Sequence, residues 1–329
     1  MNRHPSRRAV CATAGAAMVS TVLPRRGMAQ AWPQRPLRLI VPFPAGGGTD
    51  AISRQLAERI GQNSGFTLVI ENRAGAGGNI GLDAVAKAAP DGYTIGMGQA
   101  SNLAINSALY PKMPYDPLTD FAPISSVASQ PLVVVVSSKS EIRSLADLVG
   151  AAKKKPNAVS LGHAGNGTVG HLGGELFGRR AGVKLLIVPY KGIAPAVTDV
   201  LGGQVDTLFG NPLAVMPLVS AGNLRAIAVT GVRRMQALPD VPTVAELGYE
   251  NFEALNWSGL VAPANTPEPI VARLNAETIA ALGRPDMLEK LAIDGSDPFP
   301  STPAAFAAFV RSEHAKWGAI VRESGIKLD

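Results

Sequence analysis

The stretch PFPAGGGTD, residues 42–50, decides the fold because it joins two segments of different periodicity. The run LRLIVPF before it (37–43) is almost continuously apolar, as a buried strand is. The segment after it (49–65) carries apolar residues four positions apart and ends at a glycine, as an amphipathic helix does: Ile52, Leu56 and Ile60. Three consecutive glycines therefore stand at a strand-to-helix junction, where open α/β folds bind ligands.

These glycines indicate an anion-binding loop. Gly46, Gly47 and Gly48 have no side chains, so a ligand can approach the backbone closely. The first amides of the following helix lack partners inside the helix and lie at the positive end of its dipole. No Lys-Ser or Lys-Thr pair follows, as a nucleotide-binding P-loop requires, which favours a carboxylate over a phosphate. The alternative is a tight turn in which Thr49 or Asp50 only caps the helix.

The rest of the chain alternates predicted strands and helices, which indicates an α/β protein with largely parallel sheets. Two similar lobes explain this series better than one sheet. The first lobe is predicted over 32–132 plus 257–329 and the second over 133–256, with crossing segments near 130–133 and 250–258. Further strands are expected at 66–72, 93–100, 131–140, 158–163 and 184–190, and further helices at 78–92, 144–156, 171–182 and from Pro267 onward.

The first 31 residues have the pattern of a removable export signal: a basic start, an apolar centre and an Ala-Gln-Ala ending. The paired Arg7 and Arg8 suggest the twin-arginine route, with the general export route as the alternative. This segment holds five arginines, no acidic residue and the only cysteine, Cys11. The remaining chain has 26 basic and 25 acidic residues, so neither nucleic-acid binding nor a disulfide is expected.

A second glycine loop, GNGTVG at 165–170, matches the spacing of a dinucleotide-binding loop. That function also requires an acidic residue about 20 positions later to bind the ribose, and the sequence has Tyr190 and Lys191 there. We therefore expect no nicotinamide or flavin cofactor. The sequence has no Cys/His cluster that could bind a metal and no nucleophile motif of a hydrolase. We therefore expect a binding protein rather than an enzyme.

Nine segments in order carry a resemblance to a known family. They include PFPAGGGTD, VIENRAGAGGNIG, GNGTVGHLGGELF, VPYKGIAPAVTDVLGGQVDTLFGN and WSGLVAPANTP, and they extend over nearly the whole chain after the signal. The sequence resembles the Bug-type periplasmic receptors, the solute-binding proteins of the tripartite tricarboxylate transporter family. This resemblance implies a type II periplasmic binding fold, in which two α/β lobes close around a small organic carboxylate.

The resemblance also implies which residues bind the ligand. On the first lobe, they are the carboxylate cradle and two polar residues after the third strand: Gly46, Gly47, Gly48, Thr49, Asp50, Ser101 and Asn102. On the second lobe, they are an opposing wall and a cleft floor: Asn166, Thr168, His171, Tyr190, Lys191, Gly192 and Asp206. The alternatives for two of them are structural, with Asp206 as a strand-end cap and His171 as a helix-start histidine.

The implied function is a monomeric periplasmic receptor that delivers its ligand to an integral-membrane permease. A receptor that presents the ligand to a signalling partner is the alternative, and an exported α/β hydrolase is a remote one. The acids bound by such receptors range over tricarboxylates, dicarboxylates, amino acids and aromatic acids. The sequence does not distinguish among these ligands.

Overall fold

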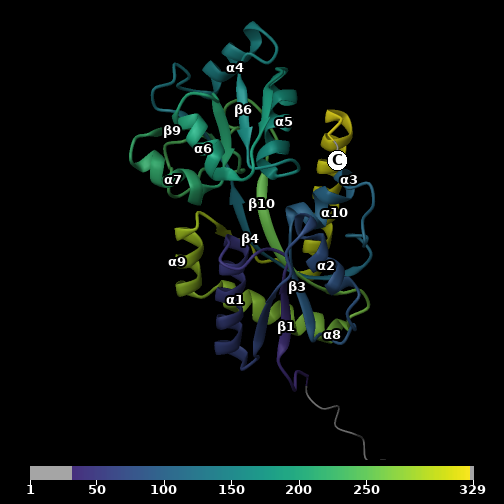
Figure 1. The fold of residues 1–329 in the computed structure, drawn as a ribbon. Helices are drawn as coiled ribbons and strands as arrows, with labels where there is room; N and C mark the ends of the chain where they lie inside the picture. Colours follow the sequence, from purple (N-terminus) through teal and green to yellow (C-terminus); the bar gives the residue numbers. More distant parts are fainter. Residues whose placement is uncertain (1–31, 327–329) are drawn as a thin grey trace, which may run out of the picture. The chain divides into compact units, whose positions relative to one another are not determined.

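The computed structural model describes residues 32–326, so the predicted export signal at 1–31 lies outside the described residues. The chain from Arg35 onward forms one compact unit. Both β-sheets and all the helices described below belong to the unit that begins at Arg35 (Figure 1). Among the described residues, no helix has the combined length and apolar character to cross a membrane.

The first sheet has six strands in the order β11-β4-β10-β3-β1-β2. Strand β1 is buried along most of its length and pairs in parallel with β2 and β3, while β10 runs antiparallel between β3 and β4. The bounds are β1 Leu37–Val41, β2 Leu68–Asn72, β3 Thr94–Gln99, β4 Phe121–Pro131, β10 Leu255–Pro263 and β11 Asp297–Pro298.

The second sheet has five strands in the order β7-β6-β8-β5-β9. Strand β6 is parallel to β7 and β8, whereas β5 is antiparallel to β8 and β9. The bounds are β5 Val133–Ser137, β6 Ser160–His163, β7 Leu186–Pro189, β8 Thr207–Gly210 and β9 Leu224–Val229. Each sheet is therefore mixed, and the prediction of largely parallel sheets holds only for β1 with β2 and β3 and for β6 with β7 and β8.

Helices follow most of the parallel strands (Figure 1). Those associated with the first part of the chain are α1 Gly48–Ser64, the short turn η1 Ala76–Gly78, α2 Asn79–Ala86, the π-helical turn η2 Ser101–Ile105 and α3 Asn106–Leu109. Those between the strands of the second sheet are α4 Leu145–Lys154, α5 Val169–Ala181, α6 Ile193–Leu201 and α7 Pro212–Ser220. The C-terminal helices are α8 Glu268–Leu282, α9 Pro285–Ile293 and α10 Pro303–Ser324.

The chain passes between the two sheets at Leu132 and again before β10. Thr230 ties these two passages together: its hydroxyl accepts from the Leu132 amide at 2.7 Å and donates to the Ala254 carbonyl at 2.6 Å. The Ala254 amide in turn donates to the Thr230 carbonyl. All three residues are buried, so these bonds are shielded from water and fix the two passages side by side.

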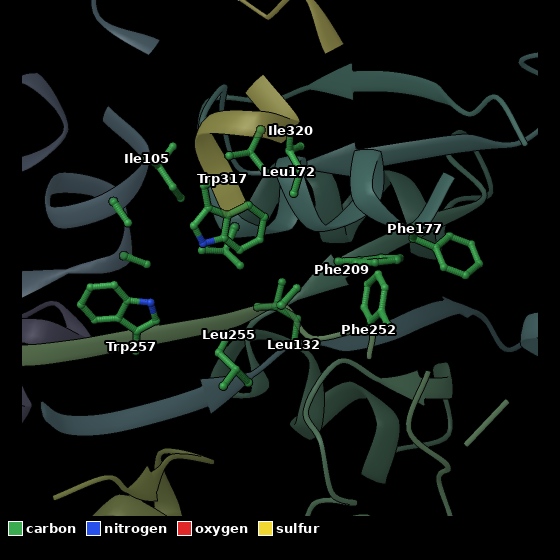
Figure 2. Close-up of a cluster of buried hydrophobic side chains, with 14 of the residues drawn as sticks. Ile105, Leu132, Leu172, Phe177, Phe209, Phe252, Leu255, Trp257, Trp317 and Ile320 are labelled. Atoms are coloured by element: carbon green, nitrogen blue, oxygen red, sulfur yellow. The ribbon is translucent and has the colours of Figure 1, made fainter. Parts of the chain in front are cut away.

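A hydrophobic cluster continues across the passages. Figure 2 shows Trp257 of β10 and Trp317 of α10 on one side, and Phe177, Phe209 and Phe252 farther along. Glu313 of α10 lies against this cluster and is only 4% exposed. Its Oε2 accepts from the indole nitrogens of both tryptophans, each at 2.9 Å, and it also pairs with Lys316. One carboxylate therefore joins α10 to β10 of the six-stranded sheet.

The loop before α1 is organised by Asp50, which is 3% exposed. Its Oδ2 accepts from the Gly46 amide and from Arg54 Nε, both at 2.9 Å, and its Oδ1 accepts from Asn72 at 2.9 Å. The hydrogen bond from Arg54 is the main reason that the pKa of Asp50 is lowered from 3.8 to about 2, and the bonds from Gly46 and Asn72 lower it further against the opposing effect of burial. The carboxylate thus holds the glycine loop against β2.

Asp50→Asn should lower the free energy of unfolding by roughly 1–3 kcal/mol at pH 7, because an amide cannot accept at all three contacts. A folded pKa below the unfolded one means that the unfolded chain binds more protons in acid. The advantage of the natural chain over the variant should therefore be complete above about pH 4 and decrease toward pH 2. Urea unfolding at pH 7 and pH 3 measures this difference, and an equal difference at both pH values would contradict it.

Glu313→Leu should destabilise the protein by roughly 2–6 kcal/mol, since it leaves two buried indole N–H groups unpaired at about 1–3 kcal/mol each. Glu313→Gln keeps an acceptor oxygen and serves as the matched control, with a much smaller loss. Urea unfolding of both variants tests this role. Equal stability of the two variants would show that the indoles do not depend on this carboxylate.

Candidate functional site

Two adjoining cavities of about 250 and 330 Å³ lie where the two sheets face each other. They share lining residues from both sheets and from the loops after them: Gln99, Ile193, Asn211 and Asn256. Gln99 ends β3 and Asn211 directly follows β8, so both lie at carboxyl ends of parallel strands. We treat the two cavities as one cleft, at the sheet edge where open α/β folds bind ligands.

Four helices begin at this cleft. First-turn residues of α1, α5, α6 and α7 line it: Gly48, Thr49, Val169, Gly170, Ile193, Leu213 and Ala214. A side-chain hydrogen bond caps α5, whereas α1, α6 and α7 have no such cap. Amides in the first turn have no partner within their helix and carry a partial positive charge. Together they make the cleft a favourable place for an anion.

Neutral polar side chains complete the lining and are partly paired with one another. Gln99 donates its side-chain amide to the Thr49 hydroxyl, and Asn256 donates to the side-chain oxygen of Asn211 at 2.7 Å. Gln130 donates to Ser296 at 3.3 Å. The pair formed by Asn211 and Asn256 connects the start of α7 to β10, so it joins the two sides of the cleft directly.

Charge is sparse in the cleft. Of the residues that line the two cavities in the described part of the chain, only Asp294 is acidic, and none is basic. Burial raises the pKa of Asp294, while Lys290 partly offsets that effect. No lysine or arginine lines either cavity within residues 32–326. An anion in the cleft would therefore rely on backbone amides and neutral side chains.

Five of the residues singled out from the sequence come together here. Gly48 and Thr49 line one cavity, while Ser101, Asn166 and Thr168 line the other. Gly46 and Gly47 lie just before them in the same exposed loop. Both glycine-rich loops thus reach the cleft, from opposite sheets.

Two first-lobe residues have structural contacts instead. Asp50 is buried and is bonded on both carboxylate oxygens, so it holds the loop and lines neither cavity. Asn102 is 1% exposed, and its side-chain oxygen accepts from the backbone amide of Gln99 at 2.8 Å. It therefore supports the end of β3 from behind the cleft.

The residues Tyr190, Lys191 and Gly192 of VPYKG do not line the cleft, but the residue that follows them does. The Tyr190 hydroxyl donates to Asp199 at 2.6 Å, and burial, aided by that carboxylate, raises the pKa of Tyr190 to about 12. Lys191 is exposed, and Gly192 precedes α6. None of the three lines a cavity, but Ile193, the next residue, lines both.

Asp206 does not line the cleft, although the sequence predicted it in the cleft floor. It precedes β8, and its carboxylate accepts from the amide and hydroxyl of Ser160 at 2.7 and 2.6 Å. Ser160 begins β6, which is parallel to β8, so this contact lies at the amino ends of the strands. Five residues later, directly after the end of β8, Asn211 lies at the cleft. Asp206 is thus the strand-end cap that the sequence left as its alternative.

His171 also turns inward. It is 4% exposed and its Nδ1 accepts from the Gly167 amide at 3.1 Å, so it contacts the loop rather than the cavity.

The lining residues that the sequence did not single out include Gln99, Asn211, Asn256, Phe43 and Tyr110. The rule that strand carboxyl ends meet at the cleft could have found Gln99 and Asn211. Asn256 is on an antiparallel strand, and no sequence pattern marked it.

Comparison with known proteins shows the family to which the chain belongs. The sequence model of the TctC family, described as the tripartite tricarboxylate transporter family receptor, matches residues 52–326. Protein BugT of Bordetella pertussis is 41% identical over 301 residues, which cover 91% of this chain and 92% of BugT.

Solved structures give the same result. The R. palustris protein Rpa4515, determined with adipate, is 37% identical with a TM-score of 0.78, covering 91% of this chain and 100% of its own. MatC (Rpa3494) from Rhodopseudomonas palustris, with bound malate, is 32% identical with a TM-score of 0.73, covering 88% and 99%. The periplasmic binding protein BugD is 37% identical with a TM-score of 0.74, covering 90% and 100%. This chain therefore belongs to the TctC family of tripartite tricarboxylate transporter receptors, which are periplasmic solute-binding proteins of two-lobed α/β fold.

Proposed function

We propose that the cleft binds a small organic acid by its carboxylate and that the protein delivers this acid to an integral-membrane permease. The observation that carries the proposal is the convergence of four helix starts on a cleft without a lysine or arginine in its described lining. A carboxylate there gains charge-assisted hydrogen bonds from backbone amides at the positive ends of the helix dipoles. The matches to receptors holding adipate and malate support aliphatic dicarboxylates as the first ligands to test.

The lobe boundaries at 132/133 and 256/257 belong to the same proposal. All strands of the six-stranded sheet fall within 37–131 and 255–298, and those of the five-stranded sheet within 133–229. The bonds of Thr230 to Leu132 and Ala254 lie where the chain passes between the sheets, which supports a hinge at that point. Closure about this hinge would bring the two glycine loops onto the ligand.

We further propose that the receptor works as an exported monomer, led to the periplasm by residues 1–31, and that it is a carrier rather than an enzyme. The family match supports the periplasmic location. Uptake of a radiolabelled acid by cells with and without this gene tests delivery to the permease. Binding in vitro without any change in uptake would favour a receptor that signals instead.

Adipate or malate at saturation should raise the melting temperature, while adipamide, the neutral diamide of adipate, should not. A ligand at 100 times its Kd stabilises the folded state by about 2.7 kcal/mol, which is a shift of a few degrees in a chain of this size. The diamide presents NH₂ groups toward backbone donors and leaves them unpaired. Differential scanning fluorimetry makes the comparison.

Gly48→Leu should abolish this response, because Gly48 lines the cavity at the start of α1. Nothing lies within 4 Å of a Cβ at this position, and its φ is not positive, so the side chain can be accommodated without backbone strain. Gly150→Leu is the matched control: it lies on the exposed side of α4, also with nothing within 4 Å of its Cβ. Stabilisation by adipamide equal to that by adipate, or a normal response of Gly48→Leu, would reject the proposed site.

A further inference from the structure

Two buried histidines lie directly behind the loop that carries Asn166 and Thr168 into the cleft. His163 ends β6 and is 1% exposed, while His171 lies in the first turn of α5 and is 4% exposed. Their rings are stacked, with centroids 4.2 Å apart and planes inclined by 8°. Neither ring lines the cavities, so their role is in what they do to the loop.

Each ring accepts a hydrogen bond from an amide of that loop. The Gly165 amide donates to His163 Nδ1 at 3.2 Å, and the Gly167 amide donates to His171 Nδ1 at 3.1 Å. A backbone N–H can only donate, so both Nδ1 atoms must be unprotonated and the proton of each neutral ring must be on Nε2. Burial lowers the pKa of both histidines, and the neighbouring ring lowers the pKa of His171 further, to about 4.

The loop needs this support because its backbone is unusual. Gly165 and Gly167 have φ values of 137° and 77°, in the region that favours glycine. Between and after them, Asn166 and Thr168 line the cavity. The two bonds fix the Ala164–Gly165 and Asn166–Gly167 peptide planes, and so they restrict the backbone on which Asn166 reaches the cavity.

The cost of this arrangement shows that packing alone does not explain it. The Nε2 of His163 is buried and has no hydrogen-bond partner among the described residues. A buried N–H without a partner is unfavourable, because the group has lost its hydrogen bonds to water. An apolar side chain would avoid that cost but would leave the Gly165 amide unpaired instead.

We propose that His163 and His171 are positioning residues of the ligand site, holding its second glycine loop in the binding conformation through their unprotonated Nδ1 atoms. The inference rests on the proposed carboxylate-binding function for its ligand, and on the geometry of the pair for its mechanism.

Variants of His171 test the proposal with a matched pair. Asparagine places an acceptor oxygen two bonds from Cβ, where the histidine has Nδ1, and leucine has a similar branched shape without an acceptor. His171→Asn should bind adipate within about threefold of the natural Kd, whereas His171→Leu should raise Kd at least about tenfold, because the Gly167 amide loses its partner. Isothermal titration calorimetry, on variants of matched melting temperature, measures both.

A measurement on the unsubstituted protein needs no ligand and no variant. In ¹⁵N-labelled protein, a scalar coupling should pass across the hydrogen bond from the Gly167 amide nitrogen to His171 Nδ1, and likewise from Gly165 to His163. Absence of both couplings would overturn the proposal, as would equal adipate affinity of the asparagine and leucine variants. If adipate fails to bind the natural chain, the proposed function fails, and the couplings still decide whether the histidines hold the loop.

Discussion

Backbone amides that a helix cannot pair within itself are the feature on which the rest of this site depends. The starts of α1, α5, α6 and α7 all face one cleft, and the described lining contains no lysine or arginine. An anion held by oriented peptide groups avoids the large desolvation that a buried guanidinium would bring. In the proposed binding mode, amides would fix the carboxylate and neutral side chains would contact the rest of the ligand, so ligands of different shape could be bound.

Amides can serve in this way only if their loops are held still. Behind the first loop, the Asp50 carboxylate bonds Gly46, Arg54 and Asn72. Behind the second, two neutral imidazoles accept from glycine amides. Charged and titratable groups are thus placed one layer behind the cleft, where they organise backbone, while the lining stays almost uncharged. Preorganisation of this kind lowers the ordering cost that binding would otherwise carry.

Sequence periodicity was sufficient for the α/β class, the first helix and both glycine loops, because these depend on local patterns. Gly48 and Thr49 belong to the first of these loops, whereas Ser101, Asn166 and Thr168 were predicted from the resemblance to the receptor family, and all five line the cleft. Periodicity did not predict which residues reach the cleft where this depends on the direction of a strand. Asp206 and Asn211 lie at opposite ends of β8, and only the pairing of that strand shows which end faces the cleft.

The antiparallel strands were the other feature that local patterns could not supply. Asn256 reaches Asn211 because β10 crosses beside β4, a pairing between residues more than a hundred positions apart in the chain. The inward direction of His171 likewise depends on His163 of β6, whose ring stacks on it. Both are tertiary contacts, and no spacing within one segment encodes them.

A crystal structure of the protein with a bound dicarboxylate tests the central claim most directly. At least one carboxylate should lie within hydrogen-bond distance of first-turn amides of α1, α5, α6 or α7, with Asn166 or Thr168 closing over it. Carboxylate oxygens paired with a lysine or arginine, or a ligand bound away from the helix starts, would contradict binding by backbone amides.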